Sequence, residues 1–221
     1  MIFIFIVIFL NILYIIILYY YFIYYYPKIY ILDKFKKTCK NNYKILNLKN
    51  PIRKIKILNY ELIDIYKENN NFTFLFKDFD IEKSIDFLYY IEKDLKLFQN
   101  YINCNKTIMY IYENIKSSLF IPTDTNIKII GHGVGGMIAL LFFLDIDINL
   151  KKTIDLYGVP IFCDNTLNEI INKRNLKINN YIFMNDPLIN FIDNNKHRYI
   201  KNSKIKYSDK FYSHSFQEYY I

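Results

Sequence analysis

The sequence predicts an α/β fold in which a mostly parallel sheet carries helices on both faces, preceded by an N-terminal transmembrane helix. Three observations lead to this prediction. Apolar runs typical of buried strands alternate with helix-like segments along much of the chain, as in parallel sheets. A glycine-rich turn at residues 131–136 joins one such strand directly to a helix. Residues 1–26 contain no charged side chain.

The N-terminal segment has the length and composition of a membrane anchor. Residues 2–26 are apolar or aromatic except for Asn11, which is long enough to cross a bilayer core. The tyrosine-rich residues 19–26 are typical of an interfacial aromatic belt. We therefore expect a single-pass N-terminal anchor over 1–27. The alternative is a secreted protein after signal cleavage, although the chain has no basic start and no A-x-A-like cleavage site.

The lysines that follow this segment bear on its orientation. They are Lys28, Lys34, Lys36, Lys37 and Lys40. An excess of lysine after the span favours a cytosolic domain. We expect a linker leading into the domain over 28–57 and the domain itself over 58–221.

Periodicity and β-branched runs predict the remaining elements in order. The expected helices span 59–66, 84–98, 107–120, 134–144 and 167–173. The expected strands span 72–76, 127–130, 154–159 and 181–184. The helix over 84–98 rests on apolar positions at Ile85, Leu88, Ile91 and Leu95, which lie on one helical face. The alternation of the two kinds of segment gives the mostly parallel sheet.

The turn at residues 131–136 has the pattern of a nucleophile elbow. The strand before it is β-branched and the helix after it is apolar nearly all round, so both must be buried. Gly131 and Gly135 would let strand and helix approach without Cβ clashes, and Gly133 would hold a strained positive φ. His132 is expected to be structural. A phosphate-binding loop is the alternative, but neither glycine-rich phosphate fingerprint matches this spacing well.

Four motifs in order resemble the class 3 lipases, the α/β-hydrolase family of fungal triacylglycerol lipases. Residues 131–136, including Gly136, resemble G-H-S-L-G-G, and 156–160 resemble T-F-G-x-P. Residues 185–188 resemble N-D-x-V, and 212–221 resemble Y-S-H-S-x-x-E-Y-W-I. The resemblance covers about residues 60–221 and implies an α/β-hydrolase-like fold, with Asp186 as the triad acid and His214 as the general base. It also implies a lid over 84–98, for which a helix that only covers the sheet is the alternative.

Two departures from the family pattern affect the chemistry. Gly133 stands at the nucleophile position and has no Oγ with which to form an acyl-enzyme. Asp78 and Phe79 stand where the family has Gly-Ser/Thr, whose last residue helps to build the oxyanion hole. An aspartate would repel a developing oxyanion and a phenylalanine offers no donor. The backbone N–H of Val134 would then be the remaining arm of the oxyanion hole.

We therefore expect a membrane-associated, lipase-like protein that is catalytically impaired. The alternatives are an active lipase or esterase that uses the Asp186 and His214 groups, and a non-catalytic lipid- or partner-binding module. Ser213 and Ser215 flank His214 but are poor substitutes for an elbow serine. A glycine introduced by a single base change is a further alternative. The expected partner is a membrane or an acyl-chain ligand, and the sequence does not identify a protein partner.

Composition argues against several other classes. The net charge is +8, but the lysines are scattered and no nucleic-acid motif is present, so we expect a membrane surface and no nucleic acid. Cys39, Cys104 and Cys163 have no framework spacing. Of the three histidines, His197 lies in a polar run typical of a solvated loop. We expect no metal and no cofactor.

Overall fold

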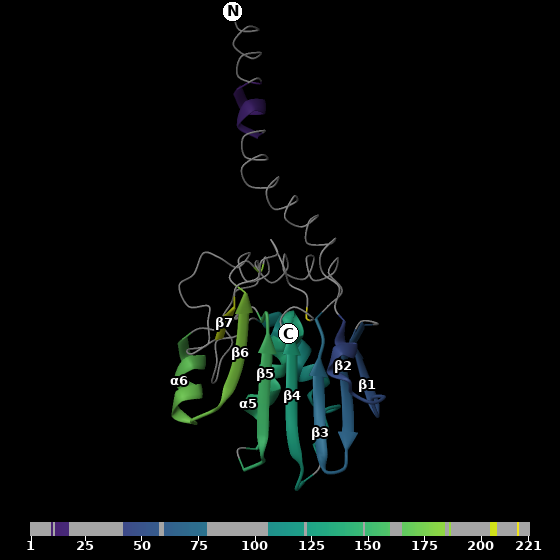
Figure 1. Cartoon of the computed structure of the whole chain (residues 1–221). Coiled ribbons are helices and arrows are strands. Elements are labelled where there is room, and N and C mark those ends of the chain that lie inside the picture. The colour runs from purple at the N-terminus through teal and green to yellow at the C-terminus, as the bar shows by residue number, and fades with distance from the viewer. Residues whose placement is uncertain are drawn as a thin grey trace, which may run out of the picture.

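The computed structural model describes Leu10, residues 12–17, 42–57, 60–78, 106–121, 123–147, 149–159, 165–183, Asp186, 204–206 and Phe216. Seven strands form one mixed sheet in the order β1-β2-β3-β4-β5-β6-β7 (Figure 1). The strands are β1 Arg53–Ile57, β2 Tyr60–Glu68, β3 Asn71–Phe76, β4 Asn126–His132, β5 Lys152–Tyr157, β6 Ile178–Phe183 and β7 Lys204–Lys206. The pairs β1–β2 and β2–β3 are antiparallel, and β3 to β7 run parallel. The carboxyl ends of the parallel strands therefore share one edge of the sheet.

Three described α-helices pack on one face of this sheet. They are α4 Lys106–Lys116, α5 Gly133–Asp145 and α6 Asn165–Lys173. Helix α5 is buried from Gly133 to Phe143 because nearly every side chain in it is apolar, and it lies against β3, β4 and β5. Its Phe142 ring packs on Phe74 and Phe76 of β3 at centroid distances of 4.9 Å and 5.6 Å. The helices and this face share one hydrophobic core.

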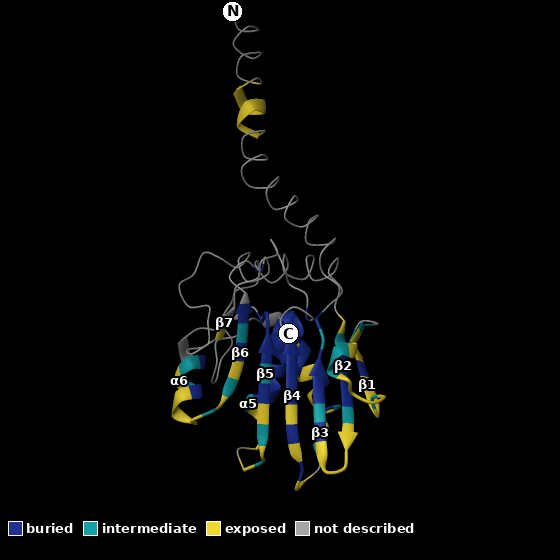
Figure 2. Cartoon of the chain, in the orientation of Figure 1, coloured by how far each residue is buried: buried dark blue, intermediate teal, exposed yellow. Residues whose placement is uncertain are grey.

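The opposite face has a second, smaller core near the carboxyl ends of the strands. Leu75, Ile130 and Tyr157 form it together with Phe216. The 3-10 helix η2 (Tyr43–Leu46) packs over it. Figure 2 shows buried residues concentrated in the carboxyl-end halves of β4 and β5, with exposed residues toward the other ends. In the described part of the chain, α-helices therefore cover one face, while η2 and Phe216 cover the other.

Most predicted elements are confirmed with small shifts at their ends. The predicted strands correspond to β3, β4, β5 and β6, and three predicted helices correspond to α4, α5 and α6. Helix α4 ends at Lys116 rather than at residue 120, because Ser118 and Leu119 donate back to Ile115 and Lys116 in tight turns. The predicted helix over 84–98, with its alternative role as a lid, lies outside the described residues.

The predicted helix over 59–66 is wrong, because Tyr60–Glu68 form strand β2. Its Ile63 and Ile65 point to the helical core and pair with Phe76 and Phe74 of β3. A turn with Asn69 at φ 53° joins the two strands, since asparagine tolerates this left-handed conformation. Pairing along the whole of β3 therefore overrides the weak local preference for a helix.

The segment predicted to be an N-terminal anchor is described only in part. Leu10 and residues 12–17 are helical, with exposed side chains. Within the described ranges, no helix is long and apolar enough to cross a membrane.

Candidate functional site

The turn between β4 and α5 is abrupt. His132 is the last residue of β4, with φ −129° and ψ 137°, and Gly133 is the first residue of α5. Gly133 has φ 53°, a conformation that residues with a Cβ adopt only at a cost. The strand therefore becomes a helix within one residue, and the first backbone N–H groups of α5 face the carboxyl edge of the sheet. This is the geometry expected of a nucleophile elbow.

The neighbouring glycines allow close packing around this turn. A Cβ at Gly135 would overlap the carbonyl oxygen of Lys77, which follows β3. A Cβ at Gly136 would overlap Val159 after β5, and a Cβ at Gly131 would lie 2.6 Å from Gly136 Cα. Real Cβ atoms essentially never come so close to other heavy atoms. The start of α5 is thus pressed against the ends of two strands, and larger residues would push it away.

Asp78 occupies the space in front of the turn. Its Oδ1 accepts a hydrogen bond from the Val134 backbone N–H at 2.9 Å. A Cβ built on Gly133 would overlap Asp78 Cγ and Oδ1. The Asp78 residue is only 9% exposed. Its carboxylate therefore fills the volume where a side chain at residue 133 would begin, and it uses the N–H that sequence analysis assigns to the oxyanion hole.

A buried tyrosine connects Asp78 to the histidine of the turn. The Asp78 backbone N–H donates to Tyr43 Oη at 2.9 Å, and Tyr43 Oη lies 3.0 Å from His132 Nδ1. Because the tyrosine oxygen accepts from Asp78, its own proton is available to donate to His132. Burial, and secondarily the Asp78 charge, hold the pKa of Tyr43 well above its ordinary value. Tyr43 is therefore neutral. His132 is fully buried and has a structural role in this series of hydrogen-bonded groups.

Phe216, in the C-terminal motif, packs beside the turn between β4 and α5. Its ring packs on Tyr43, His132 and Tyr157 at centroid distances of 4.8 Å, 5.3 Å and 5.2 Å. Phe216 is fully buried. Phe216 of the C-terminal motif therefore lies against His132 of the turn.

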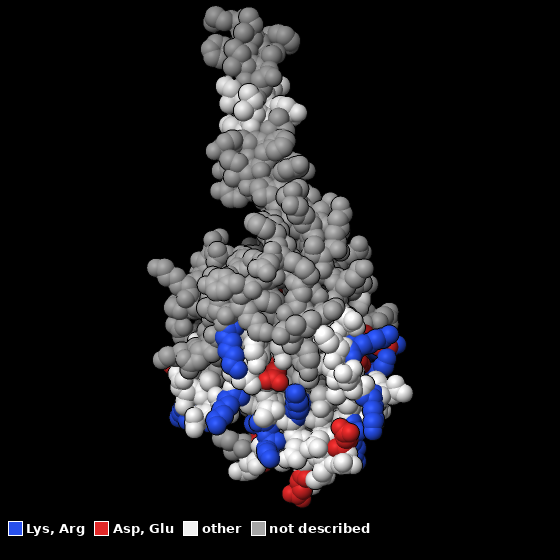
Figure 3. All heavy atoms as spheres, in the orientation of Figure 1, with Lys and Arg blue, Asp and Glu red and all other residues white. Residues whose placement is uncertain are grey.

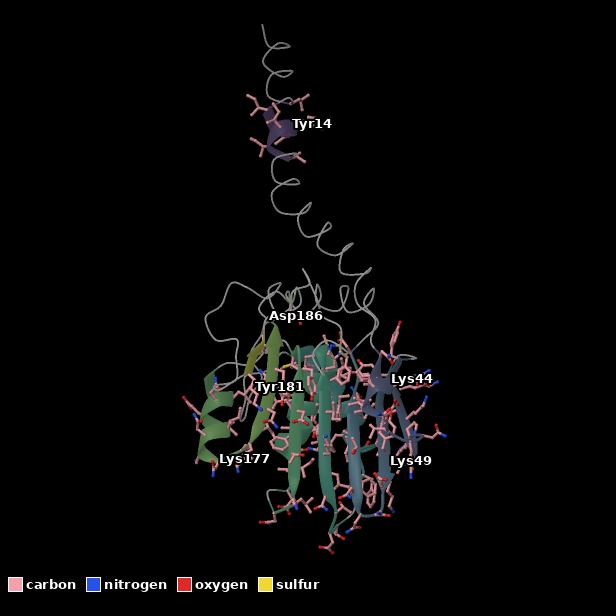
Figure 4. All side chains as sticks on the ribbon, viewed as in Figure 1. Tyr14, Lys44, Lys49, Lys177, Tyr181 and Asp186 are labelled. Carbon is pink, nitrogen blue, oxygen red and sulfur yellow. The ribbon has the colours of Figure 1, made fainter. Side chains whose placement is uncertain are left out.

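The remaining predicted site residues are described unequally. Asp186 is fully buried, and Figure 4 shows it beyond the carboxyl end of β6, at the edge of the sheet that α5 also faces. His214 and Phe79 lie outside the described residues. The structure thus brings together Gly131, His132, Gly133, Val134, Gly135 and Gly136 with Asp78, and places Asp186 at the same edge of the sheet.

Sequence analysis missed Tyr43 and the charge pair beside it. Tyr43 lies in the segment predicted as a linker, and no local pattern distinguishes it from the other 22 tyrosines of the chain. Lys77 Nζ donates to Asp64 Oδ2 at 3.0 Å, with only 13% and 10% of the two side chains exposed. The pairing of β2 with β3 brings these residues together. A helix over 59–66 would not bring Asp64 beside Lys77, so the sequence does not predict this pair.

The charges on the described surface are scattered. Figure 3 shows Lys and Arg side chains spread over the front of the sheet with fewer acidic ones among them. One such contact joins Lys128 to Asp155 at 3.8 Å. Among the described residues, no group of three or more His, Cys, Asp or Glu side chains could hold a metal ion.

Comparison with solved structures finds lipases. The Rhizomucor miehei triacylglyceride lipase superposes with a TM-score of 0.55 at 12% identity, covering 72% of this chain and 66% of that one. The Rhizomucor miehei lipase in complex with its propeptide gives a TM-score of 0.53 at 13% identity, covering 76% and 64%. The chain thus spans less than two thirds of the length of either lipase chain. No family model and no curated protein matches the sequence. These superpositions show a lipase-like α/β fold.

Proposed function

We propose that this protein is a membrane-associated, lipase-like protein that binds a neutral lipid through its acyl chain and does not hydrolyse esters. One observation carries the proposal. The elbow residue Gly133 has no side chain, and the Asp78 carboxylate sits in its place on the Val134 N–H. The fold shared with solved triacylglyceride lipases supports the choice of lipid as ligand class.

The chemistry of ester hydrolysis explains why this arrangement would be inactive. A serine hydrolase needs a hydroxyl that attacks the carbonyl and N–H donors that stabilise the oxyanion. Loss of the triad serine alone costs about 10⁶-fold in turnover, and the residual rate comes from the oxyanion hole and substrate binding. Here Gly133 lacks the hydroxyl and the Val134 N–H is already bonded to a carboxylate. Both the nucleophilic attack and the stabilisation of the oxyanion are therefore reduced.

The other residues receive roles consistent with this proposal. Gly131, Gly135 and Gly136 allow the close packing of the turn, and His132 anchors it through Tyr43. Asp186 and His214 are the remaining acid and base of a triad without its nucleophile. Phe79 replaces the second oxyanion donor.

An active esterase is the second candidate. Its support is the burial of Asp186 at the carboxyl edge of the sheet, where a triad acid would orient the base. In this case His214 would activate a water molecule that attacks the ester directly. Turnover that disappears in the His214→Ala variant would favour this candidate over the binding protein.

Membrane association rests on the sequence. The uncharged segment over 1–27 would anchor the chain, and the net charge of +8 would add attraction to anionic headgroups. The alternative remains a secreted protein from which this segment is cleaved. The mass of the mature protein in its native cell distinguishes the two, because cleavage near residue 27 would remove the anchor.

A binding experiment tests the proposal directly. The full chain in detergent micelles is titrated with a fluorescent dialkyl glycerol ether, whose ether bonds cannot be hydrolysed. We expect saturable binding that an unlabelled long-chain ether displaces and a short-chain ether does not. A fluorescent fatty acid should bind more weakly, since its carboxylate would meet the Asp78 charge. Absence of saturable binding would contradict the proposed acyl-chain ligand.

A further inference from the structure

We propose that the Asp78 carboxylate is an internal ligand of the α5 N-terminus that excludes any side chain at residue 133, so Gly133 and Asp78 form a coupled pair. The inference rests on the proposed function, because it states what closes the elbow to esters. The Asp78 carboxylate takes the place of the missing side chain at residue 133. It also takes the place that the oxyanion of an ester reaction would occupy. A serine at residue 133 alone would then not restore a hydrolase site.

Asp78 and a side chain at residue 133 would occupy the same space. Of the glycines in α5, only Gly133 would place an added Cβ against Asp78. The overlap involves the carboxylate carbon and Oδ1 rather than the end of a long, flexible chain. Asp78 has a short side chain on a fixed backbone, so it can make room only by leaving the Val134 N–H. Any side chain at residue 133 therefore competes with Asp78 for the same volume.

The Asp78 charge also complements the N-terminus of α5. The first N–H groups of a helix lack intrahelical partners and carry a partial positive charge. The first turn of α5, which is described throughout, contains no acidic residue, and the N-cap residue His132 provides no side-chain hydrogen bond to it. The Asp78 carboxylate reaches this turn from β3 and accepts from Val134. It thus provides the hydrogen-bond acceptor that a capping side chain usually provides, and adds a negative charge to it.

Backbone contacts hold Asp78 in front of α5. The Lys77 N–H donates to the Leu62 carbonyl at 2.8 Å, which extends the β2–β3 pairing beyond Phe76. The Lys77 carbonyl lies against Gly135, and the Asp78 N–H donates to Tyr43 at 2.9 Å. The backbone that leads into Asp78 is therefore held at Lys77 and at the Asp78 N–H. The pairing of β2 with β3 therefore directs the carboxylate to the N-terminus of α5.

Variants of the full chain test the coupling. We compare the natural protein with Gly133→Ser, Asp78→Gly, and the two double variants Gly133→Ser/Asp78→Gly and Gly133→Ser/Asp78→Asn. Asparagine keeps the bulk of aspartate, whereas glycine removes it. Thermal unfolding measures stability. A fluorophosphonate measures access, because the Ser Oγ attacks phosphorus, the P–F bond breaks, fluoride leaves and the serine proton passes to a base.

We expect Gly133→Ser to lower the unfolding temperature by several degrees and to remain unlabelled. Adding Asp78→Gly should recover much of this loss, and adding Asp78→Asn should recover little. Additive effects of Gly133→Ser and Asp78→Gly on the unfolding temperature would overturn the inference. Full labelling of Gly133→Ser with Asp78 present would also overturn it. Ester turnover by the natural protein would instead contradict the proposed function and leave the coupling intact.

Discussion

Replacing Gly135 by alanine tests the close approach of α5 to β3. The new Cβ would overlap the Lys77 carbonyl oxygen and lie 2.7 Å from the Lys77 carbonyl carbon and 3.1 Å from that of Phe76. These are backbone atoms in a paired hairpin, so they cannot rotate away. Overpacking in a well-filled site costs about 1–3 kcal/mol. We take the upper end, about 3 kcal/mol, because the neighbours are backbone.

Helix propensity acts in the opposite direction. Alanine is about 1 kcal/mol better than glycine inside a helix. The net prediction is therefore a loss of about 2 kcal/mol, which corresponds to a decrease of roughly 4–8 °C in the unfolding temperature of a chain of this size.

The sign of the change decides between the two effects. Thermal unfolding of the Gly135→Ala variant and the natural protein is followed by circular dichroism in the same detergent. If alanine leaves the unfolding temperature unchanged or raises it, the close contact between α5 and the end of β3 is refuted. The placement of Asp78 against Val134 would lose its support at the same time.

Two further predictions concern the buried polar groups near the turn. Tyr43→Phe leaves the Asp78 N–H without its acceptor and should cost about 1–3 kcal/mol at pH 7. Because the folded-state pKa of Tyr43 is raised, its contribution is complete below about pH 10 and decreases above it. The free energy of unfolding of both proteins is therefore measured from pH 8 to 11. The difference between the natural protein and the Tyr43→Phe variant should become smaller at the alkaline end. A difference that stays constant would contradict a neutral buried Tyr43. Lys77→Met removes the ammonium group that pairs with the buried Asp64 carboxylate, and should cost about 3–5 kcal/mol. The control Lys56→Met, whose side chain is 61% exposed, should change stability by less than about 0.5 kcal/mol, and equal effects of the two variants would refute the buried pair.

The turn between β4 and α5 could be predicted from sequence because its requirements are local. A β-branched run, closely spaced glycines and an apolar helix leave few other conformations. The positive φ at Gly133 and the buried α5 both follow from residues adjacent in the chain. The strands β3, β4 and β5 were likewise evident as buried runs between polar turns.

The features that depend on distant contacts could not be predicted. Strand β2 has a sequence compatible with a helix, and only its pairing with β3 decides between them. The sequence predicts that Asp78 repels an oxyanion, but it does not show that the carboxylate itself bonds the Val134 N–H, 56 residues away. Tyr43 joins the site from a separate segment, 89 residues before His132. Such partners are set by the fold rather than by spacing.

Ester turnover by the natural full chain tests the central claim most directly. Short-chain and long-chain nitrophenyl esters are supplied in mixed micelles, and release of nitrophenol is compared with micelles that contain the His214→Ala variant. We expect the two proteins to show the same background rate with both esters. Turnover well above background that disappears in His214→Ala would contradict the account, because the residues around Gly133 would then support catalysis without the elbow serine.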